Sequence, residues 1–244
     1  MGRAFEVRKA AMAKTAAAKS KVYSRYGKEI YIAAKNGEAN PEMNVELARI
    51  IDKAKSEQVP NDVIKRAIEK AKGGTDEHYD ALRYEGFGPG ASTLIVDCLT
   101  DNTNRTFSEV RNCFTKTDSK VGVSGSVSYA YDQVGILTFK AEDEDSVLET
   151  LLMSEVDVIE LEVHGEEITV IVNPKDLYLA KESLEKTFEI EKFLTLEITM
   201  LAKNYENLDG ENLERFEKLL AMLDECEDVQ NVYHNINMWK FKRL

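Results

Sequence analysis

The chain has 244 residues, 43% of them hydrophobic and 31% charged, and its formal net charge is −12. This length allows one large domain or two to three small ones, and this composition excludes a wholly disordered or collagen-like chain. The apolar runs are far shorter than the ~20 residues of a membrane-spanning helix. The many lysines and arginines of residues 1–28 argue against a secretory signal. We therefore expect a cytoplasmic protein that does not contact membranes.

Cysteine and histidine usage predicts neither a metal site nor a cofactor. The cysteines are widely separated and form no C-x-x-C pair, which argues against a disulfide framework and against a cysteine zinc site. The histidines are not paired at metal-ligand spacing. The six residues are Cys98, Cys113, Cys226, His78, His164 and His234.

Charge is distributed unevenly along the chain. Residues 1–72 contain 16 Lys and Arg against 9 Asp and Glu, a net charge of +7. Residues 141–200 contain 4 against 17, a net charge of −13. Such asymmetry indicates a polyanionic partner for the basic part, although a solvated lysine-rich helical face would give the same pattern.

Residues 1–73 are typical of a small basic helical bundle. Good helix formers fill the first part, and apolar residues then recur every three or four positions. Asn36-Gly37, Pro60 and Gly73-Gly74 mark helix ends. The predicted helices are 5–19, 21–35, 44–57 and a shorter one that begins at Asn61 or Asp62.

The next stretch predicts one half of an α/β sandwich, because short β-branched segments flank a helical one. The helix is expected from about Asn104 to Thr117, with Asn104 or Thr106 as its cap. Thr106-x-x-Glu109 matches a capping box. The strands are predicted at 82–85, 92–99 and 127–131.

Residues 135–200 predict a complete unit of their own. The expected order is strand, helix, strand, strand, helix, strand, which is the ferredoxin-like motif. His164-Gly165-Glu166 is placed where the central hairpin must turn, and Pro174 suits the first turn of a helix. The predicted strands are 135–140, 156–163, 167–173 and 190–200, and the helices are 145–154 and 175–187.

A helix at 211–226 and a strand at 229–236 follow this unit without partners. The strand–helix–strand segment 92–131 also cannot bury its apolar side alone, so we expect the two pieces to pack together and complete one split sandwich. The predicted fold class is α+β and multidomain: an N-terminal helical bundle followed by two ferredoxin-like α/β domains, the third inserted into the second. The predicted domains are 1–73, 74–133 plus 205–244, and 134–204.

The motifs do not indicate an enzyme. Gly86-x-Gly88-x-Gly90 lacks the spacing of a nucleotide-binding loop, and Ser124-Gly125-Ser126 lacks the nucleophile-elbow pattern. The acidic run at 142–145 is typical of a solvated helix start. We therefore expect a non-enzymatic protein with no catalytic residues.

The basic helices carry the strongest functional signal. Lys21, Arg25 and Lys28 recur at i, i+4 and i+7, so they share a helical face that can neutralise phosphates. Arg105 and Arg111 form a second candidate, because helix N-termini bind anions, although ordinary capping would also explain that segment. The predicted nucleic-acid-binding residues are Arg8, Lys9, Lys14, Lys19, Lys21, Arg25, Lys28, Arg105 and Arg111.

Longer strings spread over nearly the whole chain resemble the YebC/PmpR family. They are Met1-Gly2-Arg3, Ser20-Lys21-Val22-Tyr23, Ile51-Asp52-Lys53-Ala54-Lys55, Arg83-Tyr84-Glu85-Gly86-Phe87-Gly88-Pro89, Leu99-Thr100-Asp101-Asn102 with Asn104-Arg105-Thr106, and Gly125-Ser126-Val127-Ser128-Tyr129. Two segments depart from the usual Trp-Ala-Asn-Ile and Gly-Gly-Asn patterns: Ala4-Phe5-Glu6-Val7 and Ser119-Lys120-Val121-Gly122.

The resemblance implies a helical bundle followed by two α/β domains, one inserted in the other. Family members are commonly described as DNA-binding transcriptional regulators. A mitochondrial relative is a translational activator of cytochrome c oxidase subunit I, and some bacterial members resemble ribosome-associated factors that relieve stalling. The implied partner is therefore nucleic acid, either DNA or ribosomal RNA.

Three interpretations remain open. The first is a DNA-binding transcriptional regulator, which is how members of the resembled family are commonly described. A ribosome-associated translation factor is favoured by the acidic body, which a long duplex would repel, and by long expected loops that do not match a helix-turn-helix. A protein-interaction module that uses the acidic third domain is the last alternative.

Overall fold

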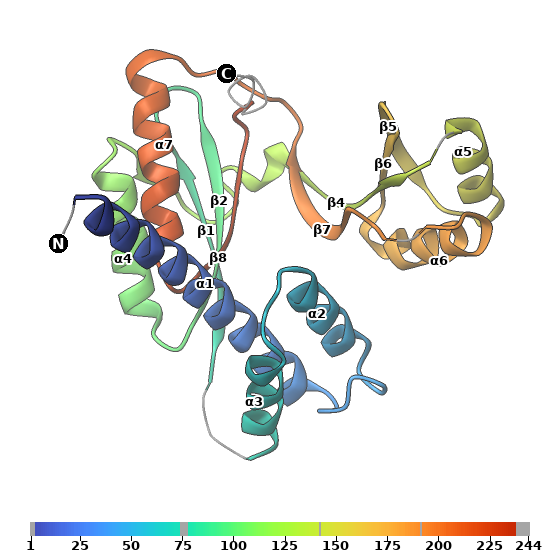
Figure 1. The fold of residues 1–244 in the computed structure, drawn as a ribbon. Coiled ribbons are helices and arrows are strands. Elements are labelled where there is room, and N and C mark those ends of the chain that lie inside the picture. The colour runs from blue at the N-terminus through green and yellow to red at the C-terminus, as the bar shows by residue number, and fades with distance from the viewer. Residues whose placement is uncertain (1–2, 74–77, 142, 191, 238–244) are drawn as a thin grey trace.

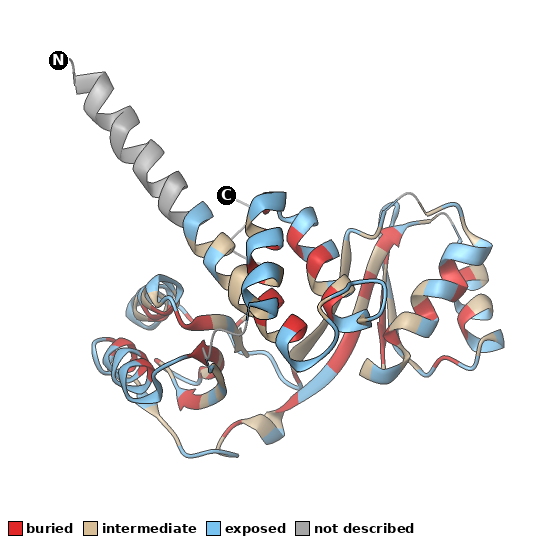
Figure 2. Ribbon diagram, turned by 90° about the horizontal axis from the view of Figure 1, so that it is seen from below, coloured by how far each residue is buried: buried red, intermediate tan, exposed pale blue. Residues whose placement is uncertain are grey.

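The structure of the protein is a computed structural model that describes residues 3–73, 78–141, 143–190 and 192–237; for residues 3–18 and for His164 it describes the backbone alone. The architecture is mixed α+β, with two antiparallel four-stranded sheets and an N-terminal group of helices (Figure 1). Buried residues follow the inner sides of the helices and run through the strands (Figure 2).

The N-terminal part is helical, as predicted. Its helices are α1 (Arg3–Asn36), α2 (Val45–Ser56) and α3 (Asn61–Lys72). The prediction of two helices at 5–19 and 21–35 is wrong, because α1 is continuous over 34 residues. Ser20 alone separates the two predicted segments, and it does not interrupt a helix with good helix formers on both sides.

The connection between α2 and α3 is shorter than the long loop expected there. It consists of the four residues 57–60, and Gln58 in it adopts a positive φ of 61°. The core of this helical part is formed by apolar side chains from all three helices, among them Ile30 of α1, Leu47 of α2 and Ile64 of α3. Tyr26 joins this core and is 1% exposed.

The first sheet has the strand order β3-β1-β2-β8. α4 and α7 cover one of its faces, where Val96 packs with Phe114 of α4 and Phe216 of α7. β8 pairs with β2, which is the pairing expected for the unpartnered C-terminal helix and strand. The elements are β1 (Asp80–Phe87), β2 (Thr93–Thr100), α4 (Thr103–Thr115), β3 (Lys120–Val121), α7 (Gly210–Glu225) and β8 (Val229–His234).

The predicted strand at 127–131 is wrong. A 3₁₀ turn, η1 (Ser128–Ala130), occupies most of it, and the next strand begins only at Tyr131. The reason is the buried Glu85 of β1, whose carboxylate accepts the backbone N–H groups of Val127 and Ser128 at 2.7 and 2.9 Å. Those donors are therefore unavailable to a strand partner.

The second sheet has the order β5-β6-β4-β7, with α5 and α6 packed on it, as expected for the βαββαβ unit. β4 begins four residues before the predicted start, and the predicted domain boundary after residue 133 lies inside it. The elements are β4 (Tyr131–Lys140), α5 (Glu144–Met153), β5 (Val158–His164), β6 (Glu167–Val172), η2 (Pro174–Asp176), α6 (Leu177–Thr187) and β7 (Thr195–Ala202).

The two sheets and the helical part contact one another. Ile95 of β2 and Tyr131 and Ala202 of the second sheet share a small buried cluster. The helical part reaches the second sheet through α2: Nζ of Lys53 lies 3.0 Å from a carboxylate oxygen of Glu197 in β7. The two sheets thus meet at this cluster, and α2 lies below β7 in the view of Figure 1.

Candidate nucleic-acid interface

The nine cations predicted to bind nucleic acid lie on α1 and α4. Arg8, Lys9 and Lys14 are among the α1 residues whose side chains lie outside the described part of the structure. Lys19 is exposed and forms no ion pair with any described residue. Arg111 on α4 is likewise exposed and, within the described chain, is not in an ion pair.

Lys21 and Arg25 contact carboxylates of the protein itself. Nζ of Lys21 lies 3.1 Å from Oδ1 of Asp224 at the end of α7. Nη2 of Arg25 lies 3.0 Å from Oε2 of Glu57, which follows α2. A phosphate would therefore have to compete with these carboxylates for either cation.

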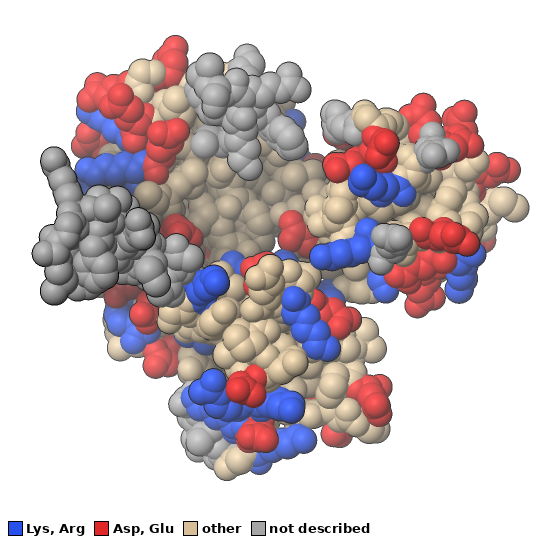
Figure 3. All heavy atoms as spheres, viewed as in Figure 1, with Lys and Arg blue, Asp and Glu red and all other residues tan. Residues whose placement is uncertain are grey.

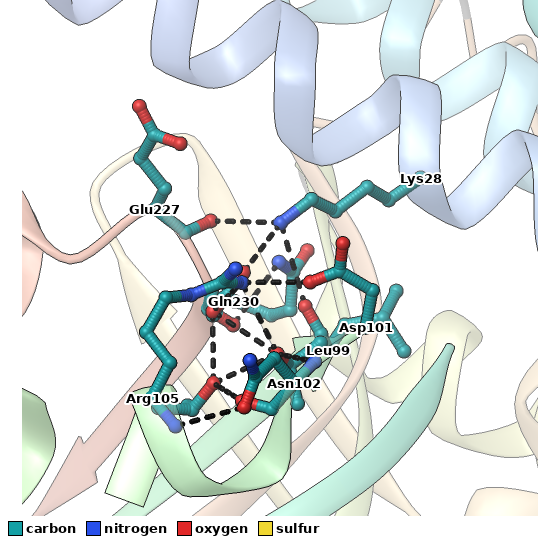
Figure 4. A network of polar contacts seen from close by, with 10 residues as sticks. Lys28, Leu99, Asp101, Asn102, Arg105, Glu227 and Gln230 are labelled. Atoms are coloured by element: carbon teal, nitrogen blue, oxygen red, sulfur yellow. Dashed lines mark hydrogen bonds and ion pairs between the residues drawn. The ribbon is translucent and has the colours of Figure 1, made fainter. Parts of the chain in front are cut away.

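Lys28 and Arg105, predicted as members of two separate sites, meet at one carboxylate. Nζ of Lys28 lies 2.8 Å from Oδ1 of Asp228, and Nη2 of Arg105 lies 2.7 Å from Oδ2. Figure 4 shows the two cations reaching the same point from α1 and α4. The side chains of Asp228 and Lys28 are 4% and 16% exposed, whereas that of Arg105 is 45% exposed, so this ion triad has a buried carboxylate and one cation that reaches solvent.

Asp228 stays ionised because its hydrogen bonds outweigh its burial. Burial alone would raise the pKa of its carboxyl group, whereas hydrogen bonds from Lys28, Arg105 and Thr106 favour the charged form and lower the pKa to about 2. The Thr106 hydroxyl donates to Oδ2 at 2.8 Å, and the Thr100 hydroxyl does so at 3.1 Å. The carboxylate thus joins α1, β2, α4 and the residues before β8.

The cap of α4 differs from both predicted caps. Asn102 is the N-cap, with extended backbone, and its side-chain oxygen accepts the N–H of Arg105 at 3.1 Å. Asn104 and Thr106 are inside the helix, so the proposed capping box is absent. Thr106 is 1% exposed and uses its hydroxyl for Asp228, a role that the local sequence does not reveal.

A cleft of about 690 Å³ opens beside this triad, between α1, α4 and α7. Carboxylates outnumber cations along its wall, so it does not favour a phosphate group. Arg105 already holds Asp101 and Asp228 at 2.8 and 2.7 Å. The charged lining residues are Lys28, Arg105, Lys116, Asp101, Glu109, Glu225, Glu227 and Asp228.

A different group of cations faces solvent on α3. These residues are Lys65, Arg66, Lys70 and Lys72, and we call them the α3 basic face. Nζ of Lys70 lies 5.7 Å from the centroid of the Tyr31 ring. Lys65, Arg66 and Lys72 form no ion pair with a described residue. Figure 3 shows Lys and Arg gathered over α3, with acidic side chains among them, while Asp and Glu are frequent over the second sheet and its helices.

The sequence contained the signal for this face. Ile64 and Ala67 are buried against the rest of the bundle, so the opposite side of the same helix must be exposed. The sequence prediction gave weight to cations that share a face of α1, whereas nothing local showed that carboxylates from distant segments would pair with them.

The described ranges contain neither a metal-ligand cluster nor a membrane-spanning helix. No group of three or more His, Cys, Asp or Glu side chains there is arranged to hold a metal ion. No helix in that same part of the chain is long and apolar enough to cross a membrane.

Comparison with known proteins places these features in a wider group. Residues 3–74 match the family model described as the TACO1/YebC protein N-terminal domain, and residues 79–236 match that of the TACO1/YebC second and third domain. A probable transcriptional regulatory protein of Vibrio campbellii is 52% identical over 96% of this chain and 99% of its own length. One from Alteromonas mediterranea is 50% identical over 96% and 98%. The crystal structure of a conserved hypothetical protein from Aquifex aeolicus superimposes with a TM-score of 0.75 at 34% identity, covering 89% of this chain and 90% of the other.

Proposed function

Because this chain belongs to the TACO1/YebC family, we propose that it is a non-enzymatic regulator of gene expression that binds nucleic acid through its N-terminal helices. Its relatives are named probable transcriptional regulatory proteins, which supports the regulatory role. The observation that carries the nucleic-acid proposal is the α3 basic face, where three cations have no carboxylate partner among the described residues.

The α3 basic face supplies phosphate contacts in this proposal. Lys65 and Lys72 are seven residues apart, so they lie two turns apart on the same side of α3. Exposed cations of this kind bind phosphates and release counterions. The four-residue connection before α3 has the length of the turn in a helix-turn-helix, in which the second helix is presented to nucleic acid.

The α1 cations have a different role in this proposal. Lys21 and Lys28 hold α1 against the C-terminal segment through Asp224 and Asp228. Reversing their charge would place like charges together, so it would disturb folding as well as any binding. The α3 basic face offers the cleaner test because Lys65, Arg66 and Lys72 have no such partners among the residues described.

The test is fluorescence anisotropy with a labelled RNA hairpin and a labelled DNA duplex of equal length, over a series of salt concentrations. The triple variant Lys65→Glu, Arg66→Glu, Lys72→Glu is expected to bind at least about tenfold more weakly. The slope of log affinity against log salt concentration should decrease in magnitude by about two to three, since each lost phosphate contact removes about 0.9 from that slope.

The matched control is Lys175→Glu, Lys192→Glu, Lys218→Glu, which makes the same charge change away from α3 at exposed lysines that likewise have no carboxylate partner among the described residues. It is expected to bind nearly as the wild-type protein does. Unchanged binding by the α3 variant, or equal losses in both variants, would contradict the assignment to α3. Circular dichroism of both variants checks that the fold is retained.

A ribosome-associated translation factor is the second candidate. Residues 141–200 have a net charge of −13, and a long duplex would repel so acidic a body. A basic end on an acidic body suits docking of that end alone into an RNA-rich site. Polysome gradients of cells with the tagged protein, with and without ribonuclease, distinguish the two: salt-sensitive migration with ribosomes supports translation, and chromosomal crosslinking without it supports transcription.

A further inference from the structure

Two cysteines that are far apart in the chain lie side by side in the structure. Cys113 on α4 and Cys226 at the end of α7 are 113 positions apart, yet their Sγ atoms are 3.6 Å apart. No sequence pattern indicates this pair, because the two residues come from the two separated pieces of the first-sheet unit.

This pair is reachable by small molecules. Both cysteines line the cleft of about 690 Å³ between α1, α4 and α7. Cys226 is partly exposed, and Cys113 forms the buried side of the contact. The third cysteine, Cys98, is buried in β2, where burial raises its pKa to about 12, so it is far less reactive.

The contact also favours the reactive form of one thiol. The hydrogen bond from the Cys226 thiol stabilises a Cys113 thiolate, which lowers the pKa of Cys113. The thiolate is the nucleophile in thiol oxidation, and a second thiol within reach can then resolve the oxidised product.

We propose that Cys113 and Cys226 form a redox-active dithiol that hydroperoxides convert into a reversible disulfide between α4 and α7. The Cys113 thiolate attacks one peroxide oxygen, the O–O bond breaks, and a sulfenic acid and one water result. The Cys226 sulfur then attacks the sulfenic sulfur, the S–O bond breaks, and a second water leaves. Two thiols lose two electrons and two protons, and one hydrogen peroxide is reduced to two waters. A dithiol reductant reverses the bond.

The disulfide would act on the segment that holds α1. Cys226 begins the turn in which the Val229 N–H donates to the Cys226 carbonyl at 3.3 Å. The same turn presents the Glu227 carbonyl and the Asp228 carboxylate to Lys28. Oxidation would therefore link the turn that contacts Lys28 of α1 covalently to α4. This holds whether or not the protein binds nucleic acid.

The experiment treats the full-length protein with a few molar equivalents of hydrogen peroxide, blocks the remaining thiols with N-ethylmaleimide and digests it with trypsin under non-reducing conditions. The cleavage sites separate the three cysteines into peptides 84–105, 112–116 and 219–240. The expected product is peptide 112–116 linked to peptide 219–240, lighter by two hydrogen atoms than their sum and absent after dithiothreitol.

Three variants complete the experiment. Cys98→Ser should give the same linked peptide as the wild-type protein, and Cys113→Ser and Cys226→Ser should give none. Linkage through Cys98, linkage only between two protein molecules, or oxidation of Cys113 to sulfinic acid without any linked peptide would overturn the proposal. Circular dichroism of the untreated serine variants confirms that the loss of the link does not come from misfolding.

Discussion

Asp228 joins two cations from different parts of the chain. Lys28 comes from α1 and Arg105 from α4, and both were predicted to bind phosphates. The helical spacing of Lys21, Arg25 and Lys28 puts them on one side of α1, but spacing does not show which residues of other segments face that side. Only the folded chain brings Asp228 there, about 200 positions away from Lys28.

The Asp228→Asn variant should lose about 2 kcal/mol of unfolding free energy at neutral pH, because the mostly buried Lys28 and the partly exposed Arg105 lose the counter-charge that they share. The measurement is urea denaturation. The control is Asp224→Asn, whose carboxylate is 87% exposed and pairs with Lys21 alone among the described residues, so its loss should be below about 1 kcal/mol.

The same substitution should change the acid response. The folded pKa of Asp228, about 2, lies below its usual value of 3.8, so its contribution to stability is present above pH ~4 and is lost as pH falls toward 2. Denaturation at several pH values should show a smaller decrease in stability over this window for Asp228→Asn than for the wild-type protein. Parallel curves, or equal effects of the two asparagine variants, would show that Asp228 does not hold α1 and α4 together.

At the scale of elements, the sequence predicted helices well where the spacing of apolar residues and the positions of Gly, Pro and Asn indicate the same limits. α2, α3, α5 and α7 each lie within about two residues of their predicted limits. The failures at α1 and at residues 127–131 both concern segments without a strong local signal. At α1, helix formers on both sides of Ser20 keep the helix continuous. At residues 127–131, the distant Glu85 carboxylate takes the backbone N–H groups that a strand would need.

Gly27 tests whether α1 is continuous. It lies inside α1, and a Cβ added there would have no atom within 4 Å. Gly27→Ala should therefore raise the unfolding free energy by about 0.5–1 kcal/mol, because alanine favours the helix and restricts the unfolded chain. Urea denaturation measures this gain.

The matched control is Gly86→Ala. A Cβ at Gly86 in β1 would collide with the buried ring of Phe114, so this variant should be destabilised by at least about 1 kcal/mol. If Gly27→Ala destabilised the protein instead, α1 would not be helical at that position.

At the scale of the molecule, we propose that the predicted three-domain division describes how the chain folds. The core of the second sheet is built from residues of one continuous stretch, from Leu137 to Ile198. The core of the first sheet needs Phe216, Leu219 and Leu223 from α7, which follows that stretch in the chain. The inserted unit therefore contains its own core, and the first-sheet unit does not until the C-terminal segment arrives.

A fragment of residues 130–204 is accordingly expected to unfold cooperatively on heating, at a modest temperature because a unit of this size buries a limited core. A fragment of residues 78–130 should show no cooperative transition, because the α7 side chains are missing. Circular dichroism melting curves measure both. Cooperative unfolding of the second fragment, or none in the first, would contradict the proposed division.

The sequence by itself determined the helical start, the βαββαβ unit, the family and the need for the C-terminal helix and strand to find distant partners. The predicted elements follow from local propensity and from the requirement that every apolar face be covered, whereas the family follows from longer strings that resemble it. Only the tertiary structure decided that Lys21, Arg25 and Lys28 pair with carboxylates and that two cysteines meet. It also decided that Lys65, Arg66 and Lys72 pair with no carboxylate in the described part of the chain. The physical reason is that charge pairing and thiol contact depend on distances between segments, and a linear pattern records only distances along the chain.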